Sequence, residues 1–220
     1  MSDAPLKIDF HVHTCYSFDS SITLKEVIDY AKRKGLNGVA ITDHNTVEGA
    51  LRLSKICRKT DFIIVPGLEI DTKQAHIVAL NINDRIESGM DILEALDIIH
   101  EKGGVAVLSH PFSLFKGASL KLEKLVGKID AVEVMNSCAV PFFLSVYLAR
   151  RYARAFRIPE TAGSDAHIPE VIGLCYSEVY AESDVEDILD AIRKGNTKSF
   201  GSGISINKRL KMILKRKRES

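Results

Sequence analysis

The sequence predicts an α/β protein that folds as a small, irregular (β/α) barrel. Apolar strand-like segments alternate with amphipathic helix-like segments along the 220 residues, and this alternation is typical of parallel strands covered by helices. Seven or eight such units in a chain of this length fit a small barrel. One connection is too short to hold a crossover helix, because only 71–75 separate GLEI from HIVAL. We therefore expect an antiparallel hairpin there, which makes the barrel irregular.

The expected elements follow in chain order from these patterns. The apolar run LKIDFHVH predicts a strand over 6–13, and the next helix, 23–35, opens with Thr23 and Glu26 in capping-box spacing and stops at Gly35. The further segments are a strand at 38–44, a helix at 47–59, strands at 62–70 and 75–82, a helix at 90–103, a strand at 104–111, a helix-like segment at 119–129, a strand at 131–136, a helix at 141–157, a strand at 160–167 and the closing segments 177–182, 185–195 (a helix) and 198–204.

Composition bounds the class of protein. The chain is 45% hydrophobic and 27% charged, which is ordinary for a globular domain with a real core. No apolar run approaches the roughly 20 residues of a membrane span, and the first residues lack the order of a signal peptide. The cysteines are far apart with no CxxC pair, so we expect no disulfides and a cytoplasmic location. They are Cys15, Cys57, Cys138 and Cys175.

Charge divides the chain into a barrel domain, 1–207, and a basic tail, 208–220. The tail holds seven basic residues and one acid, a net +6, whereas the remaining 23 basic and 28 acidic residues give the domain −5. The tail could be a basic amphipathic helix that touches nucleic acid or an acidic membrane surface. We favour a solvated terminal helix whose apolar stripe, Leu210, Ile213 and Leu214, packs on the barrel. Even then, the tail would attract polyanions.

The helix expected over 141–157 carries four arginines, and one of them could hold a phosphate. We favour a solvent-facing row of arginines, with Phe143, Tyr147 and Leu148 packed inward. The arginines are Arg150, Arg151, Arg154 and Arg157.

Histidines and carboxylates gather at the ends of the expected strands. His11 and His13 are two residues apart, so both face one side of their strand, with Val12 on the other. The antiparallel hairpin brings His76, which begins its strand, to the same rim. Barrels of this kind carry their active sites at that mouth, and His, Asp and Glu clusters mark metal or catalytic sites. The nine candidate ligands are His11, His13, Asp19, His44, Glu69, His76, His110, Asp165 and His167.

Nine ligands are too many for one ion, so we expect two to three divalent metal ions. Mixed imidazole and carboxylate ligation suits Zn, Mn or Fe without selecting among them. Asp9 and Asp43 neighbour ligand histidines, and either could accept the distal ring N–H of one. A loop or helix-cap hydrogen bond is an equal alternative. Ser109, Asn136 and Ser164 also fall at the rim, as substrate contacts or as turn formers.

Six sequence pieces resemble the PHP family, the polymerase and histidinol phosphatase superfamily. They run from residue 9 to 167: DFHVHTCYSFDS, AITDHN, VPGLEID, AHIVAL, LSHP and AGSDAH. The resemblance implies an irregular seven-stranded (β/α) barrel with a trinuclear metal site that cleaves phosphate esters. It places one ion on His11, His13, Glu69 and Asp165, a second on Glu69, His76 and His110, and a third on Asp19, His44 and His167. Asp19 stands where many relatives have histidine.

The implied reaction is hydrolysis of a phosphate ester by metal-activated water, with His11, His13, Asp19, Glu69, Asp165 and His167 as the catalytic set. The substrate would be a small phosphorylated metabolite, a nucleotide or an oligonucleotide end. An amidohydrolase also begins with an HxH strand, but Glu69, the following His76 and SDAH argue against it. A non-catalytic, metal-stabilised accessory subunit of a nucleic-acid enzyme is a third reading. The sequence does not reveal the oligomeric state.

Overall fold

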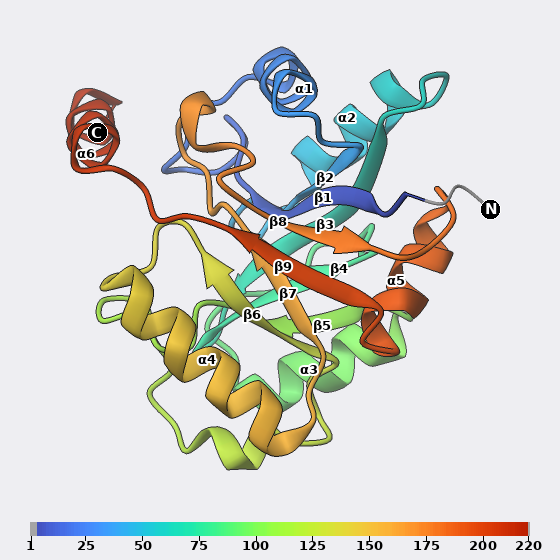
Figure 1. Cartoon of the computed structure of the whole chain (residues 1–220), viewed down its shortest axis with the longest axis vertical. Helices are drawn as coiled ribbons and strands as arrows, with labels where there is room; N and C mark the ends of the chain where they lie inside the picture. The colour runs from blue at the N-terminus through green and yellow to red at the C-terminus, as the bar shows by residue number, and fades with distance from the viewer. Residues whose placement is uncertain (1–3, 220) are drawn as a thin grey trace.

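One curled sheet forms the centre of the protein (Figure 1). The computed structural model describes residues 4–219, with side chains as far as Met212. Within this part of the chain the sheet has nine strands in the order β7-β6-β5-β4-β3-β2-β1-β8-β9. The strands are β1 (Leu6–Val12), β2 (Gly38–Ile41), β3 (Ile63–Asp71), β4 (His76–Leu80), β5 (Val105–Leu108), β6 (Ala131–Asn136), β7 (Glu160–Gly163), β8 (Cys175–Val179) and β9 (Thr197–Gly201).

The sheet curls until the end of β7 meets the end of β1. The Asp165 N–H donates to the His11 carbonyl at 2.8 Å, and the His13 N–H donates to the Ala166 carbonyl at 3.1 Å. The first residues of β1 pair instead with β8, which is antiparallel. Strands β1 to β7 thus form the irregular barrel that was predicted, and β8 and β9 extend the sheet beyond β1.

The hairpin prediction is confirmed. β3 and β4 are antiparallel, and Asp71 lies opposite His76 at the hairpin end. β4 is also antiparallel to β5, whereas the pairs β1–β2, β2–β3, β5–β6 and β6–β7 are parallel. The start of β4 therefore lies at the same rim as the carboxyl ends of the parallel strands.

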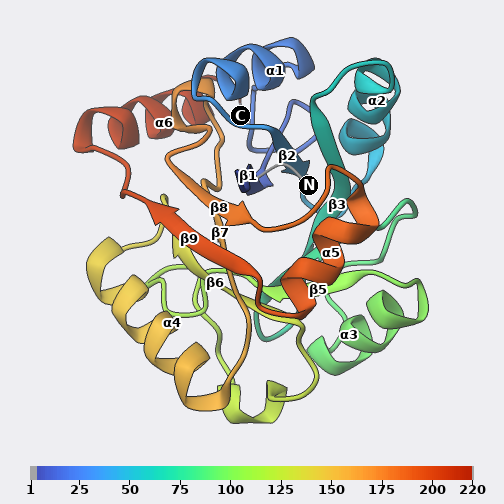
Figure 2. The ribbon, with the colours of Figure 1, turned by 45° about the vertical axis from the view of Figure 1, so that its right-hand side comes forward.

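Helices cover the outside of the sheet (Figure 2). The capping box of Thr23 and Glu26 is present at the start of α1. The expected helix over 119–129 is wrong: only a four-residue 3₁₀ helix, η1, forms there, and Gly127 has a left-handed φ of 74° that a continuing helix does not allow. The helices are α1 (Leu24–Arg33), α2 (Glu48–Cys57), α3 (Ile92–Glu101), η1 (Leu122–Leu125), α4 (Phe142–Phe156), η2 (Pro169–Val171), α5 (Val185–Arg193) and α6 (Ile206–Glu219).

The inward face of α4 is not the predicted one. Phe143 and Tyr147 are 85% and 60% exposed, and Leu148 is half-buried. The buried residues of this helix are Ser145, Ala149, Tyr152 and Ala153. Small side chains let the helix lie close to β6, so the two aromatic rings turn to solvent.

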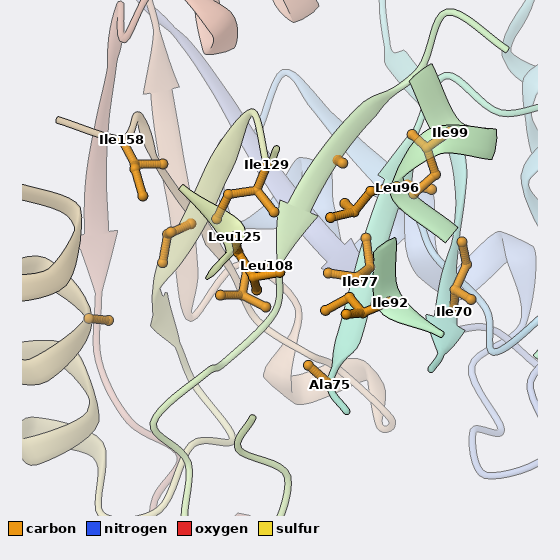
Figure 3. Close-up of a cluster of buried hydrophobic side chains, with 14 of the residues drawn as sticks. Ile70, Ala75, Ile77, Ile92, Leu96, Ile99, Leu108, Leu125, Ile129 and Ile158 are labelled. Atoms are coloured by element: carbon orange, nitrogen blue, oxygen red, sulfur yellow. The ribbon is translucent and has the colours of Figure 1, made fainter. Parts of the chain in front are cut away.

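The core has an inner and an outer part. Inside the barrel, Ile8, Phe10 and apolar residues of β2 to β6 pack against Ile188 and Ile192 of α5. This helix closes the end of the barrel opposite the carboxyl ends of the parallel strands. Outside, α3 packs on β3, β4 and β5 (Figure 3). Burying each such Ile or Leu contributes about 1.5–3 kcal/mol, so the sheet edge that carries the polar residues rests on a rigid scaffold.

The terminal helix α6 docks through a few contacts. Lys208 donates to the Glu170 carbonyl at 3.1 Å, and Arg209 donates to the Cys138 carbonyl at 3.3 Å. Met212 packs against the outer core, whereas Leu210 is 53% exposed. The side chains of Ile213 and Leu214 lie outside the described residues, so the predicted apolar stripe stays a prediction. No helix between residues 4 and 219 has the length and apolarity needed to cross a bilayer.

Candidate metal centre

All nine predicted ligands meet at one mouth of the barrel. They come from the ends of β1, β2, β3, β5 and β7, the start of β4 and the loop after β1. Their donor atoms form groups in which every pair of atoms is within 4.8 Å. Three of these groups contain the sets that the family resemblance implied: His11, His13, Glu69 and Asp165; Glu69, His76 and His110; and Asp19, His44 and His167 together with His13.

A bulge in β1 aims the two histidines of the first strand. Between Asp9 and Val12 this strand has one residue more than β2, and such an insertion reverses the alternation of faces. Ile8 and Phe10 therefore face the barrel interior, while Val12 packs outward under α1 and α2. His11 and His13 then face inward, in the sense predicted for the pair.

The first group is the most tightly packed. Nε2 of His11 lies 3.1 Å from Nε2 of His13. Oε2 of Glu69 is 3.3 Å from the first of these nitrogens and 3.4 Å from the second. Oδ1 of Asp165 is 3.3 Å from Nε2 of His13. Donor atoms that share a tetrahedral ion at about 2 Å are about 3.3 Å apart, so these separations suit a common ion.

Glu69 connects the first group to the second. Its other oxygen, Oε1, is 3.1 Å from Nδ1 of His76 and 3.1 Å from Nε2 of His110. Each oxygen of this fully buried carboxylate thus meets at least two imidazoles. A carboxylate with this surrounding is suited to bridge two ions.

The third group lies on the loop side of the mouth. Oδ2 of Asp19 is 3.0 Å from Nε2 of His167 and 3.6 Å from Nε2 of His44. The same His44 nitrogen is 3.5 Å from Oε2 of Glu69. Asp19 therefore supplies a carboxylate oxygen to this group, where many relatives present an imidazole.

Two carboxylates that the sequence reading missed orient the imidazoles. Glu133 accepts the Nδ1–H of His11 at 3.0 Å, and Asp71 accepts the Nδ1–H of His44 at 3.0 Å. These bonds fix the tautomers that leave Nε2 lone pairs directed inward. The signal was present in the sequence: Asp71 follows Glu69 by two residues, and Glu133 follows inward-facing Ala131 by two, so each points inward by strand periodicity.

Asp9 and Asp43 form loop hydrogen bonds, which was the alternative to accepting the ring N–H of a histidine. Asp9 accepts backbone N–H groups of Ser164 at 2.8 Å and Gly173 at 2.9 Å. Asp43 accepts the N–H and the hydroxyl of Thr14, at 2.5 and 2.7 Å. Burial raises the pKa of both carboxyls to about 6. Both carboxylates therefore hold the neighbouring loops in place through hydrogen bonds.

The rim residues Ser109, Asn136 and Ser164 are buried. The Asn136 amide donates to Oε2 of Glu133 at 2.9 Å, and the Ser164 hydroxyl donates to the His11 carbonyl at 3.4 Å. Of the alternatives considered for Asn136 and Ser164, these contacts favour a supporting role.

Burial and the neighbouring charges set the protonation of the central donors. Burial, together with the charge of His167, lowers the pKa of His13 to about 3, so its ring stays neutral. Burial alone would raise the pKa of the Glu69 and Asp165 carboxyls, but the surrounding cationic groups hold both well below the usual range. Burial would lower the pKa of His11, but Glu69, Glu133 and Asp165 hold it well above its usual value. A proton on His11 then lies where the lone pairs of the His11 and His13 Nε2 atoms would otherwise face each other.

A second, independent observation also indicates that these donor atoms suit divalent ions. Oε2 of Glu69 and Oδ1 of Asp165 are buried and accept no hydrogen bond from any residue that the structure describes. Leaving such an oxygen unsatisfied costs about 1–3 kcal/mol, and more when it is charged. Both atoms point at the imidazole nitrogens of the first group. A cation among them would satisfy every one of these atoms.

Backbone strain is concentrated in the same place. His110 has φ 30° and Asp165 has φ 53°, conformations that cost non-glycine residues of order 1–3 kcal/mol each. Both residues are candidate ligands. Gly163, just before the second, approaches the Cβ of His11 so closely that a side chain there would collide. These conformational costs accompany the close approach of β7 to β1, which brings the Asp165 carboxylate into the group.

Lys116 is a further residue of the mouth that the sequence did not single out. Its ammonium lies 3.6 Å from Oδ2 of Asp165, and its carbonyl accepts the Nδ1–H of His110 at 3.2 Å. Burial would lower the pKa of this amine, but Asp165 and Glu69 hold it above its usual value. Lys116 is therefore a fixed cation beside the cluster.

Comparisons with known proteins agree with this geometry. Residues 9–137 match the PHP domain family, and residues 146–197 match the PHP-associated family. An uncharacterized protein of Methanocaldococcus jannaschii is 30% identical over 187 residues, covering 82% of this chain and 73% of its own length.

Solved structures share the fold. A two-domain Bacteroides vulgatus protein containing a predicted PHP-like metal-dependent phosphoesterase superposes with a TM-score of 0.75 at 19% identity, over 96% of this chain and 69% of that one. A lesion-specific endonuclease from Pyrococcus furiosus superposes with a TM-score of 0.66 at 20% identity, over 88% of this chain and 57% of its own. With the family match covering more than half of the residues, the chain belongs to the PHP domain family.

Proposed function

We propose that this protein is a metal-dependent phosphoesterase that hydrolyses a phosphate ester of a nucleotide, an oligonucleotide end or a small metabolite. The observation that carries the proposal is the convergence of eight candidate ligand side chains around a ninth, Glu69, with two buried carboxylate oxygens that receive no hydrogen bond from the described residues. The family match supports the same chemistry. We assign His11, His13, Glu69 and Asp165 to one ion, Glu69, His76 and His110 to a second, and Asp19, His44 and His167 to a third.

Zn, Mn or Fe bound by these residues would supply Lewis acidity and an activated water. The chain's own groups have separate tasks. Glu133 and Asp71 hold His11 and His44 as Nδ1–H tautomers. His167 donates its Nδ1–H to the Asp165 carbonyl at 2.8 Å, which directs the Nε2 lone pair toward the third ion, 3.0 Å from Oδ2 of Asp19.

Two exposed aromatic rings near the mouth favour a substrate with a flat apolar part. Phe18 is 76% exposed, with its ring centroid 5.2 Å from that of His44. Phe115, next to Lys116, is 80% exposed. A nucleobase can stack on such a ring while its phosphate reaches the metal centre. We therefore place nucleotides and oligonucleotide ends ahead of small aliphatic phosphates.

The test is a substrate screen on protein loaded separately with Mn, Zn and Fe. Nucleoside monophosphates, short oligonucleotides, a general phosphate ester and a cyclic amide are assayed side by side, with His13→Ala as the inactive control. Turnover of phosphate esters is expected in at least one metal form. Turnover of the cyclic amide alone would assign the protein to the rival amidohydrolase class, and silence of every metallated form would favour an accessory subunit.

Lys116 is expected to bind the phosphoryl group. Lys116→Ala should lower kcat/KM about 100-fold, because a fixed donor to developing negative charge contributes about this much. It should also weaken inhibition by inorganic phosphate, whereas Lys116→Arg should restore part of both. Steady-state kinetics with phosphate as competitor measure the effect. Unchanged phosphate inhibition in the alanine variant would remove Lys116 from the site.

A further inference from the structure

Helix α4 carries positive charge that the rest of the protein does not neutralise. The helix contains no acidic residue. On other helices some cations have an acidic partner one turn away, as in the pairs Lys25–Asp29, Arg52–Glu48 and Lys194–Asp190. Among the side chains that the structure describes, those of residues 4–212, Arg151, Arg154 and Arg157 form no ion pair.

This arrangement is unfavourable for the helix by itself. Arg150 and Arg154 are four residues apart, and Arg151 and Arg154 are three apart, so like charges are neighbours on its surface. The carbonyl end of a helix attracts cations in its last turn, and this accounts for Arg154 and for Arg157, which caps the helix. Arg150 donates to the Ser199 carbonyl at 3.1 Å and lies 3.8 Å from Glu160, whereas neither explanation applies to Arg151.

A groove collects these charges with others from the far end of the barrel. It has a volume of about 690 Å³ and is lined by residues of α4, the start of β7, β9 and the end of α5. Glu160 is the acid in its wall, 3.8 Å from Arg150. Six cations line this groove, and two of them, Arg193 and Lys194, are paired with Asp190. The six are Arg150, Arg154, Arg157, Arg193, Lys194 and Lys198.

The exposed face of α4 continues from this groove toward the start of the helix. The exposed rings of Phe143 and Tyr147 lie on this face together with Arg150 and Arg154. These rings lie toward the start of the helix, which follows the carboxyl end of β6 and so begins at the barrel mouth. A 15-residue helix is about 22 Å long. Aromatic rings near the mouth therefore lead into arginines farther from it.

We propose that this surface, from Phe143 to Lys198, binds single-stranded nucleic acid. The arginines would contact successive phosphates, and Phe143 and Tyr147 would stack on unpaired bases. Cationic grooves with interleaved aromatic rings suit single strands because every base offers a flat face. Duplex DNA suits this surface less well because its base faces are stacked inside the duplex. An acidic protein partner would offer the exposed rings no base to stack on. This inference does not depend on the hydrolytic activity, since no residue of the metal centre takes part.

The test measures anisotropy of a labelled 12-nucleotide strand with the full chain, in chelator so that turnover plays no part. We expect affinity to fall with salt, because each phosphate contact releases counterions. Arg151→Glu/Arg154→Glu should weaken binding at least 10-fold and flatten the salt dependence. Phe143→Ala/Tyr147→Ala should weaken binding about 10-fold with the salt dependence unchanged. The matched control Lys55→Glu/Lys59→Glu makes the same charge change on exposed residues at and just after α2, away from the groove.

Each outcome decides the proposal. Circular dichroism spectra equal to wild type show that the exposed substitutions leave the fold intact. An effect of the control equal to that of the α4 variant would reduce the binding to general charge and overturn the site. Equal affinity for a duplex of the same sequence would overturn the single-strand assignment, as would tighter binding to anionic vesicles. Failure of the phosphoesterase screen would leave this result unaffected.

Discussion

Glu69→Gln is expected to abolish turnover and to empty most of the metal centre. The carboxylate lies between two groups of imidazoles, with Oε1 3.1 Å from both His76 and His110 and Oε2 3.3 Å from His11. Glutamine keeps the size of the side chain but removes the charge, and its NH₂ group would donate where a bridging oxygen is needed. We expect kcat/KM to fall at least about 1,000-fold, the loss of several kcal/mol of metal-based stabilisation.

Metal analysis of the purified variant separates this prediction from a general loss of activity. The ion content should fall from two or three per chain to one or fewer. Glu123→Gln, on the exposed face of η1, is the matched control and should keep both metal and activity. A Glu69→Gln protein with full metal content and more than a tenth of wild-type turnover would show that no ion is bridged there.

The sequence was enough to predict where the candidate ligands lie, because most of them stand at the ends of recognisable strands. Histidines at strand ends, such as His11 and His110, need only the alternation of strands and helices to be placed at one mouth. His76 needed one more step, the short connection that forced a hairpin, and the observed pairing of Asp71 with His76 confirms it. Convergence of all nine residues follows from the topology alone.

What the sequence did not carry depends on packing between distant segments. Strand periodicity indicates that Glu133 points inward, but it does not indicate that Glu133 meets the His11 ring 122 residues away. Lys116 reaches Asp165 from a loop with no regular pattern. The faces of α4 were predicted from hydrophobicity, and Phe143 and Tyr147 were placed inward. The close contact with β6 selected small residues instead, and this preference has no signature in a hydrophobic pattern.

Removal of the metal ions is expected to lower the free energy of unfolding as well as to abolish turnover. Ions at about 1,000 times their dissociation constant stabilise the folded state by about 4 kcal/mol, and the ion-free site keeps the unsatisfied Glu69 and Asp165 oxygens buried. Chelated and Mn-loaded protein should therefore differ by about this amount in the free energy of unfolding. Urea unfolding of the two forms measures the difference, and equal unfolding free energies would mean that these residues hold no tightly bound ion.

The proton on His11 gives this prediction a pH dependence of known sign. In the ion-free protein the three nearby carboxylates hold the pKa of His11 well above its usual value, so its ring is protonated near neutral pH. Binding of an ion must displace that proton, and metal affinity should rise with pH, by about tenfold per unit for each proton released. Calorimetric titration of Mn into chelated protein, in buffers of different ionisation enthalpy, counts the protons released. His100→Ala, which removes the histidine paired with Asp130 outside the metal centre, should leave that count unchanged. Binding without proton release would show that the ion does not take the place between His11 and His13, and the bridging role of Glu69 would fall with it.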